Sequence, residues 1–217
     1  MHRHLLIAAI AALAACGNTS DSPAPDETPR KQAEKARPAD PCADVALFQA
    51  ARSDDPPFSS LRGDPVMLED QPLEDNWYAK EKHFGAACHV AVMSEFFGGE
   101  TDFHLIGCTL FSEPSSFDRE ENELRARTVL EDTRTMLEGC LGDGWVMEET
   151  DQHHKADIYQ KYKFEPEGFE TPYDFTADPI YLEMSYARFP GGGVPSGWQV
   201  NLQFQEQVAS PAASEED

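Results

Sequence analysis

The chain has 217 residues, of which 40 are acidic and 17 are lysine or arginine, so its formal net charge is −23. Proteins that bind nucleic acid draw most of their affinity from basic side chains that contact the phosphates, whereas an acidic chain is repelled by them. Anionic lipid headgroups repel an acidic chain in the same way. The composition therefore argues against both of these partners. It favours either simple solubility through self-repulsion or attraction to a basic partner or to divalent cations.

The first sixteen residues have the pattern of a bacterial export signal. Arg3 lies in a short basic start, and an uncharged apolar run follows over residues 5–14. A run of about ten residues is too short to span a bilayer but has the length of the apolar part of a signal peptide. The run ends in Leu13-Ala14-Ala15-Cys16, which places small residues before a cysteine. These four residues resemble the lipobox of bacterial lipoproteins.

This resemblance implies that residues 1–15 are removed and that lipid is attached to Cys16, which becomes the first residue. Each buried methylene contributes about 0.8 kcal/mol, so two or three acyl chains such as palmitate would make the attachment permanent. By the sorting rule of enterobacteria, Gly17 after the cysteine indicates the outer membrane. We therefore expect a cell-envelope protein that is anchored by lipid and faces the periplasm. An ordinary signal peptide that ends beside an incidental cysteine is the alternative.

A single folded domain is expected over residues 40–208, a length that can bury a sizeable core. Residues 16–39 are rich in proline, serine, threonine and charge, and residues 209–217 end in an acidic cluster. Segments with so few large apolar side chains cannot offset the entropy of ordering. We therefore predict a disordered tether before the domain and a disordered acidic tail after it. No internal repeat is evident in the sequence.

Two helices are predicted. Asp40 fits the N-cap position and Pro41 the first helical position of a helix over residues 42–52. A longer helix is expected to open with a capping box at residues 115–118 and to end at Gly142. One side of this second helix is apolar at spacings of three and four residues, and consists of Ala126, Leu130, Thr133, Leu137, Cys140 and Leu141.

About six strands are predicted from alternation of apolar and polar residues and from turn signals such as Gly98-Gly99. They cover residues 84–97, 101–112, 145–150, 155–164, 180–189 and 198–205. Residues 58–75, which contain Pro65 and Pro72, are expected to be irregular. The order of these elements predicts an α+β fold, an antiparallel sheet with the two helices packed on one face.

Besides Cys16, the chain contains Cys42, Cys88, Cys108 and Cys140. An even number of cysteines in an exported chain predicts two disulfides. A two-residue turn at Gly98-Gly99 would pair Cys88 with Thr109, whereas a loop one residue longer would place it opposite Cys108. The pairing therefore stays open, and we favour Cys42–Cys140 as one of the two bonds. No C-x-x-C pair is present, so neither a thioredoxin-like site nor a zinc knuckle is indicated.

No catalytic or cofactor motif is present: the sequence lacks a nucleophile elbow, a zinc-protease helix, a phosphate-binding loop and an EF-hand loop. Adjacent His153 and His154 would point to opposite faces of a strand, and neither register places His89 opposite His104. We therefore expect no metal and no cofactor. A carboxylate pair for acid–base catalysis is not singled out among the 40 acidic residues.

One candidate interaction surface lies near the Gly-rich loop over residues 190–197, which Phe189 and Trp198 flank. The alternating strand that follows presents Gln199, Asn201, Gln203 and Gln205 on one side, which is either a hydrogen-bonding recognition face or the solvated side of the sheet. The predicted interaction surface consists of Trp198, Phe189, Gln199 and Gln203.

The leading functional hypothesis is a lipid-anchored envelope protein whose domain binds a macromolecule without catalysis. A basic envelope protein or a toxin would suit its acidity. The alternative is a periplasmic hydrolase with a carboxylate-based site, and a third is a purely structural lipoprotein. An enzyme should show a concave pocket with converging carboxylates of raised pKa. A binding protein should show a flat or convex patch with exposed aromatic side chains.

Overall fold

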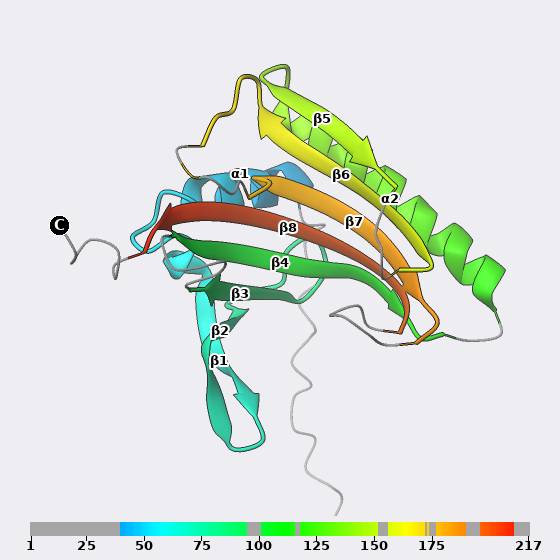
Figure 1. The fold of residues 1–217 in the computed structure, drawn as a ribbon, viewed down its shortest axis with the longest axis horizontal. Coiled ribbons are helices and arrows are strands. Elements are labelled where there is room, and N and C mark those ends of the chain that lie inside the picture. Colours follow the sequence, from blue (N-terminus) through cyan, green and yellow to red (C-terminus); the bar gives the residue numbers. More distant parts are fainter. Residues whose placement is uncertain are drawn as a thin grey trace, which may run out of the picture. The chain divides into compact units, whose positions relative to one another are not determined.

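The computed structural model describes residues 40–94, 101–115, 118–151, 156–171, 173, 177–189 and 196–210 (Figure 1). The chain divides into two units, Met1–Ala36 and Arg37–Asp217, and the described residues all lie in the second. Several predictions fall outside them: the signal peptide over 1–15, lipidation of Cys16, the tether over 16–39, residues 211–217 of the tail, the Gly98-Gly99 turn, the His153-His154 pair and the loop over 190–195.

The described part contains two α-helices, one short 3₁₀ helix and eight strands. They are α1 (Pro41–Ala51), η1 (Ser59–Leu61), β1 (Arg62–Leu68), β2 (Gln71–Ala79), β3 (Cys88–Met93), β4 (Thr101–Glu113), α2 (Arg119–Leu141), β5 (Trp145–Thr150), β6 (Ile158–Pro166), β7 (Ile180–Ala187) and β8 (Gly197–Ala209). The strands form one antiparallel sheet in the order β1-β2-β3-β4-β8-β7-β6-β5. Both helices lie on one face of this sheet (Figure 1).

The predicted α+β class, with one antiparallel sheet and two helices, is confirmed, but the strand number is wrong. The sheet has eight strands rather than about six, because β1 and most of β2 occupy the segment that was expected to be irregular. The predicted strand over 84–97 starts later, at Cys88, because a tight turn at Phe84 and Gly85, both with positive φ, precedes it.

The element order contains a repeat that the sequence does not reveal. A helix followed by a four-stranded antiparallel meander occurs twice, first as α1 with β1–β4 and then as α2 with β5–β8. The last strands of the two halves, β4 and β8, pair with each other at the centre of the sheet from Thr101↔Ala209 to Glu113↔Trp198. The two halves therefore share a topology, and their parts of the sheet meet along one strand pair.

The core lies between the helices and the sheet. Alternation in β8 points Trp198, Val200, Leu202 and Phe204 into it, and alternation in β7 does the same for Ile180, Leu182 and Met184. The ring of Phe48, on α1, meets the ring of Phe204 edge-on at 5.2 Å between centroids. Burial of each such side chain contributes roughly 1.5–3 kcal/mol, so this layer is the main source of stability.

The predicted start of α1 is confirmed, and that of α2 is not. The Asp40 side chain accepts a hydrogen bond from the Cys42 amide at 3.1 Å, and Pro41 is the first helical residue. The N-cap of α2 is Asp118 rather than Ser115, and the Asp118 side chain makes no capping hydrogen bond. Gly142, with φ of 77°, ends α2 as expected.

Both disulfides are formed, as Cys42–Cys140 and Cys88–Cys108. The first joins the start of α1 to the end of α2 and is the bond that the sequence favoured. The second joins β3 to β4, where Cys88 lies directly opposite Cys108, so the second of the two proposed registers is correct. Disulfides persist in oxidising compartments, and these two bonds are compatible with a location outside the cytoplasm.

Candidate functional site

The four residues predicted for an interaction surface do not lie together. Trp198 is 1% exposed and packs against the Tyr186 ring in the core, so its place on an interaction surface is wrong. Phe189, just after β7, is 76% exposed. Gln199 and Gln203 lie on the opposite face of β8 from Trp198, because side chains alternate along a strand.

The row of amide side chains on β8 is engaged in bonds across the sheet. Gln199 donates to the Ser112 hydroxyl at 3.3 Å, and the Tyr181 hydroxyl donates to Gln203. Asn201 in the same row accepts a hydrogen bond from Thr109 at 3.0 Å. These bonds tie β8 to β4 and β7. They occupy the amide groups and favour the structural alternative for this row over a recognition face.

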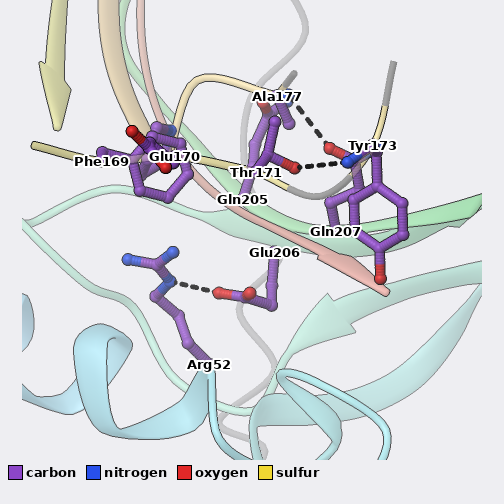
Figure 2. Close-up of a pocket in the computed structure, with 10 residues that line it drawn as sticks. Arg52, Phe169, Glu170, Thr171, Tyr173, Ala177, Gln205, Glu206 and Gln207 are labelled. Carbon is purple, nitrogen blue, oxygen red and sulfur yellow. Dashed lines mark hydrogen bonds and ion pairs between the residues drawn. The ribbon is translucent and has the colours of Figure 1, made fainter. Parts of the chain in front are cut away.

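A small cavity lies where the end of α1, the segment after β6 and the end of β8 meet (Figure 2). Its volume is about 120 Å³, well below the roughly 300–1,000 Å³ of typical ligand sites. The Arg52 guanidinium on its floor donates to the Glu206 carboxylate at 2.6 Å, which neutralises that carboxylate. The other carboxylate of the lining, Glu170, is exposed, so it lacks the burial that would raise the pKa of a catalytic acid.

A second hollow, of about 430 Å³, is an open and mainly apolar groove. It is lined by Pro41, Phe84, Gly85, Leu110, Val129, Asp132, Thr133 and Met136, and so contains a single carboxylate. Elsewhere, the Tyr162 hydroxyl donates to Glu131 and lowers the pKa of that carboxyl, the opposite of what a catalytic acid needs. Neither hollow has the paired carboxylates that the hydrolase hypothesis requires.

The described residues contain no group of three or more His, Cys, Asp or Glu side chains arranged to hold a metal ion. Within the same residues, no helix combines the length and the apolarity needed to cross a membrane. The chain matches no protein-family model, no curated protein and no solved structure. Its functional site must therefore be argued from its own surface.

The most unusual surface feature is the hairpin formed by β1 and β2, which projects from the rest of the sheet (Figure 1). Only Asn76, Trp77 and Tyr78 of β2 pair with β3. The outer part of the hairpin, closed by the Leu68↔Gln71 pair across Glu69-Asp70, pairs only within itself. It is therefore supported by its own hydrogen bonds and not by the core.

Apolar side chains are exposed near the tip of this hairpin. Met67, Leu68 and Leu73 are 50%, 63% and 37% exposed. Scattered apolar side chains are normal on a protein surface, but a group of large ones at one projecting tip is a candidate for an interaction site. We call these three residues the hairpin tip and treat it as the candidate functional site.

The base of the hairpin is packed tightly. The Arg62 guanidinium lies 4.0 Å from the centre of the Trp77 ring, and Lys80 donates to the Ser60 carbonyl at 2.7 Å. A Cβ added at Gly63 would lie 2.9 Å from the Tyr78 carbonyl oxygen, so only glycine fits there. The tip is therefore presented on a fixed base.

Polar nitrogen atoms are buried without partners beside this base. They are Nε and Nη2 of Arg62 and Nδ1 of His104, among the described residues. Burial lowers the pKa of Arg62, and burial together with the Arg62 charge lowers the pKa of His104. Buried polar groups without a hydrogen-bond partner reduce stability.

Sequence reasoning missed this hairpin for a physical reason. Pro65 and Pro72 suggested an irregular segment, since proline cannot donate to a sheet ladder. Most side chains of both strands are exposed, so no alternation of apolar and polar residues reports the pairing. The available signal was the pair Glu69-Asp70 directly after the apolar run Val66-Met67-Leu68, which is the length of a tight hairpin turn.

Proposed function

We propose that the protein is a lipid-anchored component of the cell envelope, held through Cys16 in the outer membrane and facing the periplasm, whose domain binds a protein partner without catalysis. The lipobox at Leu13-Ala14-Ala15-Cys16 supports the anchor. The observation that carries the binding function is the hairpin tip, where three large apolar side chains are exposed.

The energy available at the hairpin tip suits partner binding. Full burial of one large apolar side chain contributes roughly 1.5–3 kcal/mol. The exposed fractions of Met67, Leu68 and Leu73 add up to about one and a half fully exposed side chains. Burial of this surface by a partner would contribute roughly 2–4 kcal/mol to the free energy of binding. A contribution of this size corresponds to a hot spot at a protein–protein interface.

The anchor is tested by metabolic labelling with radioactive palmitate and by fractionation of the two membranes. Wild-type protein should be labelled and should collect in the outer-membrane fraction. The Cys16→Ser variant should lose the label. Labelling that persists in this variant would show that the lipobox interpretation is wrong.

Binding is tested by capture from solubilised envelope with the tagged, lipidated protein. The triple variant Met67→Ser, Leu68→Ser, Leu73→Ser removes the hairpin tip, and Leu124→Ser is the matched control, since Leu124 is 67% exposed on α2. The wild type and the control should retain one protein at equal stoichiometry. The triple variant should bind that protein with an affinity at least roughly 30-fold lower. Absence of any enriched protein would contradict the binding function.

A further inference from the structure

The hairpin that carries the tip is strongly acidic. Asp64, Glu69, Asp70, Glu74 and Asp75 are all exposed, and residues 63–79 contain no lysine or arginine. None of these five carboxylates takes part in an ion pair among the described residues. The hairpin that presents the apolar tip therefore carries carboxylates that make no ion pair within the described part of the chain.

The backbone of β1 restricts how a partner can bind. β1 is an edge strand, which in general offers unpaired groups to an added strand. Pro65 removes one donor from this edge, and the register shifts on both sides of it interrupt the regular ladder. Both features disfavour pairing with a strand of the partner. Contact through side chains is the remaining mode.

We propose that the hairpin tip inserts into an apolar pocket of a basic protein whose lysine and arginine side chains surround that pocket. This inference rests on the proposed binding function and specifies its partner. Apolar side chains at the centre with charges around them reproduce the usual anatomy of a protein interface. The carboxylates speed encounter with a basic surface and disfavour partners of the wrong charge.

The same charges distinguish this partner from a membrane. An apolar hairpin tip can also insert into lipid, but Glu69 and Asp70 in the turn and Glu74 beside Leu73 would be carried toward the headgroups. Proteins that dock on anionic membranes use lysine and arginine there, because the surface potential is negative. The charge of the hairpin therefore favours a basic protein over a lipid surface.

The test is site-specific photo-crosslinking in cells with the full-length protein. A photoreactive phenylalanine derivative replaces Leu68 at the tip, and in a matched control it replaces Leu124 on α2, which is equally exposed. We expect an adduct from position 68 alone, with a protein rich in lysine and arginine. Salt at about 1 M should reduce the yield of the adduct at position 68 severalfold, because salt screens the attraction between exposed charges.

A charge variant tests the acidic residues directly. Asp64→Asn, Glu69→Gln, Asp70→Asn and Glu74→Gln remove four carboxylates and keep Asp75, whose charge acts on Arg62. The control removes four exposed carboxylates elsewhere, as Glu120→Gln, Asp132→Asn, Asp143→Asn and Glu167→Gln. The adduct at position 68 should fall roughly tenfold with the hairpin variant and stay unchanged with the control.

The outcomes separate this inference from the proposed function. If the triple variant of the hairpin tip and the four-carboxylate variant captured the partner as strongly as the wild type, the inference would be overturned. The binding function would remain in place. An adduct at both positions, no adduct at position 68, or an adduct with an acidic protein would also overturn it. So would cosedimentation of the Cys16→Ser protein with vesicles of phosphatidylethanolamine and phosphatidylglycerol that depends on the hairpin tip.

Discussion

Removal of the Cys42–Cys140 disulfide should destabilise the domain more than its place on the surface suggests. The bond joins residues that are 98 positions apart, and Cys42 is exposed, so little packing is lost in a Cys42→Ala, Cys140→Ala variant. A closed loop of 98 residues restricts the unfolded chain by about 4.7 kcal/mol. The Cys88–Cys108 bond closes only 20 residues, which corresponds to about 3.3 kcal/mol.

Denaturation in urea, followed by circular dichroism, measures this effect. The free energy of unfolding should fall by up to about 4.7 kcal/mol, and the melting temperature by roughly 10–20 °C for a domain of this size. The denaturant dependence should become steeper, because the unfolded chain of the variant exposes more surface. Wild type and variant are compared under oxidising conditions so that Cys88–Cys108 stays intact.

One result would refute the reasoning. If the variant lost less than about 1 kcal/mol and its denaturant dependence did not change, the bond would not restrict the unfolded state as the loop length requires. A loss accompanied by lower helix content of the native state would instead assign the effect to packing of α1.

Three further predictions use the same measurements. The Leu68→Ser variant should keep the free energy of unfolding within about 0.5 kcal/mol, because exposed residues seldom matter for stability; a larger loss would mean that the tip packs on the domain. Asp40→Ala should cost about 1 kcal/mol, since its side chain caps α1 through the Cys42 amide, and Asp40→Asn is the control that should retain most of it. His104 has a lowered pKa in the folded state, so the unfolded chain takes up the proton first as the pH falls. Stability should therefore decrease as the pH drops below about 6.5. The His104→Gln variant should lose that part of the pH dependence, and equal slopes for the two proteins would show that folding does not change the pKa of His104.

The elements that the sequence predicts well are those that bury one face. The alternation of Trp198, Val200, Leu202 and Phe204 exists because β8 has the helices on one side only, and it therefore identifies both the strand and its inward face. Asp40 and Pro41 mark the start of α1 because the unpaired amides of a first turn need those residue types. In each case a local requirement, burial of one face or pairing of the first helical amides, restricts which residue types can occupy the positions.

The elements that the sequence misses are those without such a requirement. β1 and the outer part of β2 bury neither face, so nothing constrains their pattern. The choice between Thr109 and Cys108 as the neighbour of Cys88 depends on one residue in a turn, which composition does not report. The candidate site shares this property: the side chains of the hairpin tip are exposed, so the packing of the chain does not constrain their pattern.

The repeated topology has a consequence for the order of assembly. β4 is central in the finished sheet, but its partner β8 is the last of the eight strands in chain order. A chain that is synthesised from its N-terminus completes β4 long before β8 appears. Until then β4 is an open edge, the kind of surface on which partly folded chains aggregate. The sheet is therefore closed across its centre by the strand that is synthesised last.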